Sequence, residues 1–212
     1  QEIEAEDVDE SPGALWTQAL LEQTRRLRGH LCDSDHGTPE EPKDCVGPHL
    51  LRVVVGVDPP GGQTECGIVV AGLGDDNHRY VLYDGSLKAS PEAWAGAVLD
   101  AYAVTGADRI VGEANYGGDM MQSTVMRAAR SRGVSVSYKD VRATRGKAVR
   151  AEPCVAGYER GEVHHLGEFP LLEDELVMWV PGETTQSPNR MDALVWALTE
   201  LQVTPGWRAT VL

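Results

Sequence analysis

The sequence predicts an α/β protein in which helices cover both faces of a mixed β-sheet. Residues 51–57 (LRVVVGV) form a nearly continuous β-branched run, which is typical of a strand buried on both faces. Two further strand patterns, 66–73 and 78–83, are joined by a short Gly-Asp-Asp-Asn turn and predict a hairpin. Helix and strand patterns then alternate, which indicates crossover connections between parallel strands.

The first predicted element is a helix that begins at Ser11-Pro12, with Ser11 as its N-cap and Pro12 in its first turn. Gly29 is expected to end it. Its apolar stripe at helical spacing is Leu15, Trp16, Ala19, Leu20 and Leu27. Residues 29–49 are rich in Pro, Gly, Asp and His without periodicity, which predicts a loop or linker.

After the hairpin, Ser90-Pro91-Glu92 predicts the start of a helix that runs to about Thr105. The elements expected after it are a strand at 109–112, a helix at 119–131, a strand at 134–138, a helix at 147–160, a short strand at 163–166 and helices at 170–178 and 188–202. This order predicts a five-stranded sheet, an antiparallel meander followed by parallel strands. Residues 1–49 are expected to be an acidic leader, helix and linker, and residues 50–212 the sheet domain.

The chain carries a formal net charge of −14, from 19 basic and 33 acidic residues. This balance argues against passive binding to nucleic acid, which uses Lys and Arg to neutralise phosphates. The charge is uneven, however, because bases gather in one segment and acids in the first ten residues. The segment 139–150 holds Lys139, Arg142, Arg145, Lys147 and Arg150. Such a run forms either a solvated helix face or a cradle for phosphates, and we favour the cradle.

The four cysteines, at positions 32, 45, 66 and 154, form no CxxC pair. A zinc site at Cys32 and Cys45 with neighbouring histidines is the alternative to reduced thiols, but the spacing matches no standard finger. We expect the cysteines to be reduced thiols, as in an intracellular protein. The chain shows no secretory signal and no apolar run long enough for a bilayer, and without an initiator Met we expect a fragment of a longer chain.

Three acids lie where predicted elements begin or end. Asp58 ends the most buried strand, Glu113 ends the 109–112 strand, and Asp192 lies in the first turn of the last helix. Each acid taken singly is equally well explained as a solvated carboxylate. If the three converge, however, they form an oxygen-rich site that suits Mg²⁺ or Mn²⁺ better than zinc. Two such ions can clamp a phosphodiester.

Six segments in one order then resemble a known family. They are 56–59 (GVDP), 67–72 (GIVVAG), 112–119 (GEANYGGD), 145–147 (RGK), 158–164 (YERGEVH) and 189–193 (NRMDA). Together they resemble the nuclease domain of the large terminase subunit of tailed bacteriophages and prophages, over about residues 50 to 202. This resemblance implies a ribonuclease H-like fold and metal-dependent cleavage of double-stranded DNA.

Carried over by position, the resemblance implies that Asp58, Glu113 and Asp192 are the catalytic acids and hold two ions of Mg²⁺ or Mn²⁺. Relatives often have a further ligand three residues before the last Asp, where this sequence has Asn189. Asp119 and Asp140 are possible auxiliary acids. Lys147 and Arg145 are expected to position the phosphate. The implied partners are a packaging ATPase domain in the full-length chain, the portal protein and the small terminase subunit, in the host cytoplasm and without a membrane.

Two other functions remain open at this point. One is a phosphotransferase of the actin and sugar-kinase type, whose first strand also ends in an Asp before a Gly-rich turn. The other is a non-catalytic module that docks to the portal or small subunit through the acidic leader and first helix. No GxxxxGK[ST] motif is present, so we do not expect this chain to drive packaging by itself.

Overall fold

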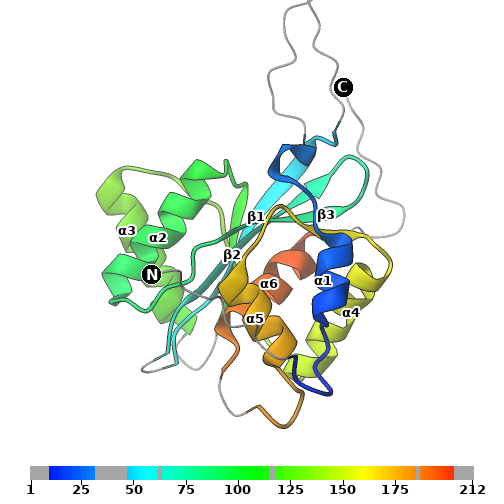
Figure 1. The fold of residues 1–212 in the computed structure, drawn as a ribbon. Helices are drawn as coiled ribbons and strands as arrows, with labels where there is room; N and C mark the ends of the chain where they lie inside the picture. The colour runs from blue at the N-terminus through cyan, green and yellow to red at the C-terminus, as the bar shows by residue number, and fades with distance from the viewer. Residues whose placement is uncertain (1–9, 32–46, 62–63, 115–117, 185–186, 203–212) are drawn as a thin grey trace, which may run out of the picture.

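The computed structural model describes residues 10–31, 47–61, 64–114, 118–184 and 187–202. Within these residues, one sheet has six strands in the order β5-β4-β1-β2-β3-β6. Strands β1, β2 and β3 are labelled in Figure 1. The strands are β1 Leu50–Asp58, β2 Gly67–Gly74, β3 Arg79–Asp84, β4 Arg109–Glu113, β5 Tyr138–Val141 and β6 Val163–His165. The predicted mixed α/β architecture is confirmed. The sheet has one strand more than predicted, because β6 pairs in parallel with β3.

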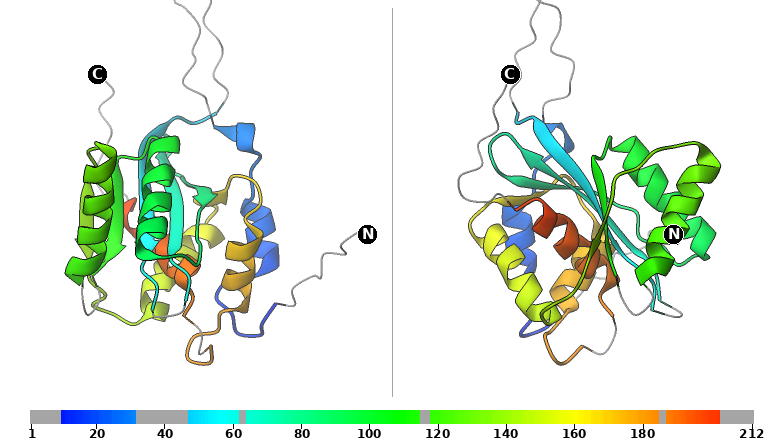
Figure 2. Two further views of the ribbon diagram at one scale, coloured as in Figure 1. Left: turned by 90° about the vertical axis from the view of Figure 1, so that its left-hand side faces the viewer. Right: turned by 180° about the vertical axis from the view of Figure 1, so that it is seen from behind.

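Two groups of helices cover the sheet, as the two sides of Figure 2 show. One face carries α2 (Pro91–Val104) and α3 (Gly118–Arg132). The other face carries α1 (Gln18–Thr24), α4 (Lys147–Glu159), α5 (Pro170–Met178) and α6 (Asn189–Glu200). Each layer has its own apolar core, because alternate side chains of a strand point to opposite faces. Val53, Val55 and Val57 face α2 and α3, whereas Val54 belongs to the core around α6.

The central strand β1 positions two of the predicted acids. It pairs antiparallel with β2 and parallel with β4, and Val57 registers with Gly112. Asp58 and Glu113 follow these two residues and therefore lie side by side at the carboxyl ends of neighbouring parallel strands. The alternation of the strands places both side chains on the face that α6 covers.

The N-terminal helix is shorter than the sequence predicts. Its N-cap is Thr17, whose hydroxyl accepts a hydrogen bond from the Leu20 N–H at 3.1 Å, so the prediction of Ser11 as the cap was wrong. The helix also ends before Gly29, because Arg25 has an extended backbone, with φ −61° and ψ 142°. Leu27, which was expected on the buried stripe, is 85% exposed.

The short helix still contributes to the core. Trp16 and Leu21 are fully buried, and the Trp16 ring packs edge-on against Tyr158 of α4. The backbone N–H of Arg26 donates to the carbonyl of His165 at 2.8 Å, next to the end of β6. The division of the chain into 1–49 and 50–212 stays a prediction.

The fifth strand lies later in the chain than predicted. The alternating residues 134–138 indicated a strand there, but β5 begins at Tyr138. Its backbone pairs Lys139 with Val111 and Asp140 with Gly112 at the edge of the sheet. Strands at the edge of a sheet often carry charged side chains, so the polar residues of β5 gave no strand pattern in the sequence.

The other predicted elements are found within about two residues of their expected ends. Asn77 in the β2–β3 turn adopts a positive φ of 65°, as a tight hairpin turn requires. Ser90 caps α2 by accepting a hydrogen bond from the Ala93 N–H. None of the helices in the described ranges has the length and apolar character needed to cross a membrane. Cys32, Cys45 and most of the acidic leader lie outside the described residues.

Candidate active site

The structure brings the three predicted acids to one end of the sheet. Asp58, Glu113 and Asp192 come from β1, β4 and the first turn of α6. All three are buried, with 5%, 8% and 1% of their surface exposed. Buried carboxylates are costly unless cations, hydrogen bonds or a bound metal compensate for them. The surroundings of these acids therefore decide what the site can do.

Glycines in the sheet set the position of Asp192. Helix α6 lies so close to β1 and β2 that an added side chain would collide with its backbone. A Cβ at Gly56 would lie 2.1 Å from the carbonyl oxygen of Ala193, and one at Gly67 would lie 1.9 Å from that of Asn189. Real Cβ atoms do not approach backbone atoms so closely. Glycine at both positions thus allows the first turn of α6 to reach the end of β1.

Two cations from α4 compensate for the buried acids. The ammonium Nζ of Lys147 lies 2.5 Å from Asp192 Oδ2. The guanidinium of Arg150 donates to Asp192 Oδ1 at 3.3 Å through Nη2 and approaches Glu113 Oε2 at 3.7 Å through Nη1. Arg150 therefore bridges two of the three acids.

Trp196 is a further part of the site. Its indole Nε1–H donates to Glu113 Oε2 at 3.2 Å, and the Arg150 Cζ lies 4.4 Å from the centre of its ring. A tryptophan in a predicted helix is ordinarily interpreted as packing, so Trp196 was missing from the candidate site residues. A usable signal was present, because Trp196 follows Asp192 by four residues and therefore lies on the same face of the helix.

Asp58 has a strongly raised pKa of about 8. The largest cause is burial, and the negative charges of Asp192 and Glu113 add to it. Lys147 and Arg150 act in the opposite direction. Asp58 is thus electrostatically coupled to both other acids, and adding a cation beside it would favour its charged form. A perturbed carboxyl of this kind is typical of functional sites.

The donor atoms fit a hard divalent cation. Asn189 Oδ1 is buried and takes no hydrogen bond from a described residue, and Asp192 Oδ2 is buried and met by the Lys147 ammonium, a cation that another cation can replace. Asn189 precedes Asp192 by three residues on the same side of α6, and its Nδ2 donates to the Glu65 carbonyl at 2.5 Å. Among the described residues, however, no three His, Cys, Asp or Glu side chains are arranged to hold a metal. The cluster thus has oxygen donors of the kind that a hard divalent cation prefers, but its side chains are not arranged as a complete coordination site.

Of the two predicted auxiliary acids, Asp140 and Asp119, the structure describes the side chain of Asp140 alone. Asp140 is exposed on β5 and registers with Gly112, so its side chain lies on the opposite face from that of Glu113. The structure therefore does not bring Asp140 to the cluster. Asp119 lies in the first turn of α3, but its side chain is outside the described residues.

The predicted basic segment is divided by the fold. Lys139 forms an ion pair of 2.6 Å with Glu200, at the far end of α6 from Asp192. Arg142 and Arg145 are exposed. Lys147 and Arg150 turn inward to the acids. Lys139 is exposed as well but is paired with Glu200, and Lys147 is half-buried beside Asp192. The use of this segment as a phosphate cradle stays a prediction.

The adjacent histidines of β6 have structural partners. The ring of His164 lies between the Thr24 carbonyl and His78, at 2.9 Å from each. His165 lies between the Tyr158 hydroxyl at 2.8 Å and Glu173 Oε1 at 2.7 Å. Both ring nitrogens of each histidine are thus engaged by the protein, as expected for a packed pair.

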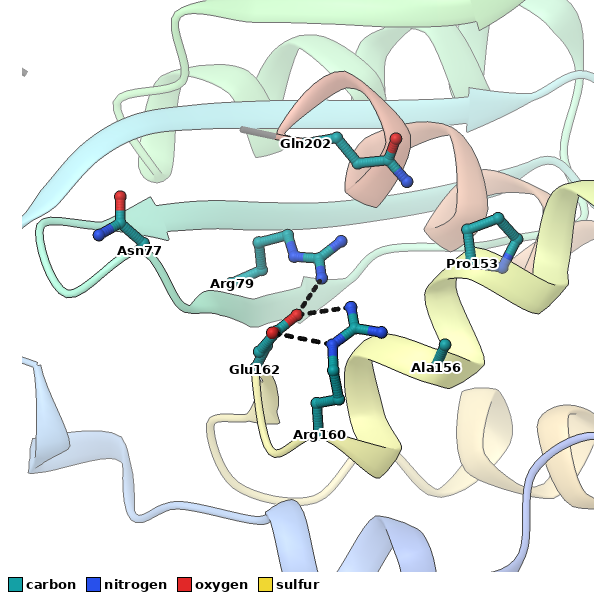
Figure 3. Close-up of a pocket in the computed structure, with 7 residues that line it drawn as sticks. All are labelled: Asn77, Arg79, Pro153, Ala156, Arg160, Glu162 and Gln202. Carbon is teal, nitrogen blue, oxygen red and sulfur yellow. Dashed lines mark hydrogen bonds and ion pairs between the residues drawn. The ribbon is translucent and has the colours of Figure 1, made fainter. Parts of the chain in front are cut away.

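A pocket of about 520 Å³ lies at the start of α4, beside Lys147. It is lined by Lys147 and Gly146 at the start of α4, and by Trp179, Ser187 and Pro188. Another pocket, of about 410 Å³, lies at the other end of α6 (Figure 3). There Arg79 and Arg160 both pair with Glu162, at 3.7 and 2.7 Å. None of the three acids lines either pocket, but the pocket beside Lys147 is near them, because Lys147 forms an ion pair with Asp192.

The sequence profile of the terminase RNaseH-like domain family matches residues 55–201. Among solved structures, the large terminase of bacteriophage HK97 is similar, with a TM-score of 0.60 and 12% identity over 88% of this chain and 43% of that chain. The large terminase nuclease of thermophilic phage G20c gives a TM-score of 0.52 and 14% identity over 70% of this chain and 82% of that chain. Its cobalt-bound structure gives 0.53 and 15% over 70% and 81%.

These likenesses confirm the predicted ribonuclease H-like fold. The chain spans less than half the length of the HK97 protein and most of the length of the G20c nuclease. No curated protein matches the chain.

Proposed function

The chain belongs to the terminase RNaseH-like domain family, and from this membership we propose that it is the metal-dependent endonuclease domain of a large terminase subunit. Its substrate would be concatemeric double-stranded DNA. The observation that carries the proposal is the meeting of the buried acids Asp58, Glu113 and Asp192 at one end of the sheet, where burial and the other two acids raise the pKa of Asp58.

The three acids would hold the metal, and Asn189 would add a neutral oxygen donor. Mg²⁺ or Mn²⁺ fits an all-oxygen set, and the cobalt-bound G20c nuclease supports the use of a divalent ion. When bound, two such ions supply Lewis-acid activation of water and stabilise the leaving oxygen of a phosphodiester. Trp196 would orient Glu113 through its indole hydrogen bond.

The DNA backbone would approach over the start of α4. Arg142 and Arg145 are exposed there, and Lys147 lines the pocket beside the acids. These cations supply the positive charge that a phosphate needs next to a carboxylate cluster. The remaining bases of the segment are engaged elsewhere, so we assign the phosphate contacts to Arg142, Arg145 and Lys147.

The family membership and the acid cluster favour the nuclease over the two alternatives. A sugar-kinase-like phosphotransferase would bind ATP and leave DNA intact. A docking module would have no need for three buried carboxylates. An attached packaging ATPase, the portal protein and the small terminase subunit belong to the proposal as partners, as does the host cytoplasm as its location.

Cleavage of supercoiled plasmid, with Mn²⁺ or Mg²⁺ and with EDTA, tests the function. We expect metal-dependent nicking that Asp58→Asn abolishes while circular dichroism stays unchanged. Asp140→Asn is the matched control, because it removes an equally charged but exposed acid on the other face of the sheet. Full nicking by Asp58→Asn would refute the assignment. ATP binding without any nicking would favour the phosphotransferase.

A further inference from the structure

We propose that Lys147 and Arg150 neutralise the acid cluster in two different ways. Arg150 is a fixed positioning residue that holds Glu113 and Asp192 together. Lys147 is an exchangeable cation, which a divalent metal ion replaces on Asp192. This inference rests on the proposed function, since it concerns the metal that the three acids would hold.

Arg150 is held on several sides. Its side chain is only 12% exposed, and its guanidinium stacks on the Trp196 ring. Nη2 donates to Asp192 while Nη1 lies near Glu113, so one planar group spans both acids. Trp196 also donates to Glu113, which ties the stacking partner to the same carboxylate. Moving Arg150 away would remove the cation that two buried carboxylates share and would uncover a buried indole face, so this cation stays in place.

Arg150 is nonetheless poorly suited to satisfy the acids alone. Its Nε and Nη1 make no hydrogen bond to any residue in the described part of the chain, and the distance from Nη1 to Glu113 Oε2 is longer than a hydrogen bond. The guanidinium therefore supplies charge and position more than bonding. The carboxylate oxygens keep lone pairs for another cation.

Lys147 is held quite differently. Its side chain is 39% exposed and lines the open pocket at the start of α4. Its ammonium lies 2.5 Å from Asp192 Oδ2, although the arrangement lacks the directions of a hydrogen bond. Ser187 Oγ lies 3.1 Å away and accepts a hydrogen bond from the same ammonium. Lys147 thus has a second partner and access to solvent, so it can leave Asp192 at small cost.

The two cations consequently compete with metal to different extents. A divalent ion on Asp192 Oδ2 needs the position that the Lys147 ammonium now takes, whereas Arg150 contacts Oδ1. Any group that binds the metal-free form alone lowers the apparent affinity for the metal. Removing Lys147 removes this competitor. Removing Arg150 removes the group that keeps the acids in register.

Thermal unfolding of the purified chain against Mg²⁺ concentration, starting from EDTA, separates the two roles. We expect Lys147→Met to lower the half-saturating Mg²⁺ concentration by roughly fivefold, the scale of one partly exposed ion pair. At saturating Mg²⁺ its melting temperature should equal that of the wild type. Arg150→Met should melt lower in EDTA and should not recover with Mg²⁺.

Arg145→Met is the matched control, because it removes a nearby exposed cation that has no contact with Asp192. An equal shift of the Mg²⁺ midpoint in Arg145→Met and Lys147→Met would overturn the exchange. Full recovery of Arg150→Met by Mg²⁺ would overturn its fixed role. Should Arg150→Met fail to fold, Arg150→Lys keeps the charge without the planar fork, and the Lys147 comparison still decides the exchange.

Plasmid nicking by the same wild-type sample separates a failure of this inference from a failure of the proposed nuclease function. Metal-dependent nicking with no midpoint shift in Lys147→Met overturns the exchange alone. Absence of both nicking and any Mg²⁺ effect on wild-type melting overturns the proposed function together with the inference.

Discussion

Gly56 of β1 and Ala193 of α6 touch through their backbones, with no room for a side chain between strand and helix. A Cβ at Gly56 would lie 2.1 Å from the Ala193 carbonyl oxygen and 2.9 Å from the Ala197 nitrogen. Both obstacles are backbone atoms, which cannot turn aside as a side chain can. The contact lies two residues before Asp58 and one after Asp192, so it fixes how these acids meet.

Gly56→Ala should therefore destabilise the protein by about 1–3 kcal/mol or more, because the added methyl forces α6 away from the sheet. Denaturant unfolding measures the loss. Metal-dependent nicking should fall with it, since Asp192 moves with its helix. Gly29→Ala is the control, as an added Cβ there meets nothing within 4 Å. Equal stability of the two variants would contradict the close packing.

Asp58 should make the metal-free protein less stable as pH rises from about 4 to about 8. Its folded pKa is raised by burial and by the neighbouring acids, so the unfolded chain loses this proton first. Asp58→Asn should flatten this part of the stability profile and raise the melting temperature at pH 8 in EDTA. Denaturant titrations at several pH values test the sign. A steeper profile in the variant would contradict it.

Glu173 should contribute stability that is lost in acid. Burial raises its pKa, but hydrogen bonds from His165 and Arg25 outweigh this effect and lower the pKa to about 2. The contribution is therefore full above about pH 4.5 and disappears as pH falls towards 2. Glu173→Gln should cost about 1–3 kcal/mol at pH 7, the scale for a buried charged hydrogen bond. The difference from wild type should shrink below pH 4, which acid unfolding curves measure.

Lys147 and Lys139 should differ in their effect on DNA binding, although both belong to the same basic segment. Lys147→Ala should weaken binding and reduce the log–log salt slope by about one, the loss of one phosphate contact. Lys139→Ala should leave the slope unchanged, because Lys139 lies beside Glu200 at the opposite end of α6 from Asp192, away from the proposed path of the DNA. Binding measured from low to moderate salt, in a buffer without divalent metal, compares them. Identical salt slopes for Lys147→Ala and Lys139→Ala would show that Lys147 makes no phosphate contact.

The positions of the acids could be predicted because they follow from local patterns. A β-branched run that stops at Asp58, and a second that stops at Glu113, place both acids at strand ends. Parallel pairing of β1 with β4 then makes them neighbours. Asp192 is recognisable as a first-turn acid. The packing of α6 on Gly56 and Gly67 brings Asp192 to the other two acids, and the sequence of α6 alone does not predict this contact.

The fate of the basic segment could not be predicted, because it depends on contacts between distant residues. Arg150 appears in the sequence as one of five bases, yet it is buried through contacts with Trp196 and Asp192 of another helix. Lys139 is neutralised by Glu200, sixty-one residues later. The sequence alone shows no difference among the five bases of this segment, whereas in the fold some face solvent, one pairs with Glu200 and two contact the acids.

The arrangement of α6 also decides when a growing polypeptide acquires its acid cluster. Strands β1, β2 and β4 precede α6 in the chain, so Asp58 and Glu113 leave the ribosome well before Asp192. Until α6 follows, the glycine-lined side of β1 and β2 has no helix to cover it, and the third carboxylate is missing. A chain truncated before Asn189 would thus be poorly folded and would lack the third carboxylate of the proposed metal site, so the site is complete only once the fold is complete.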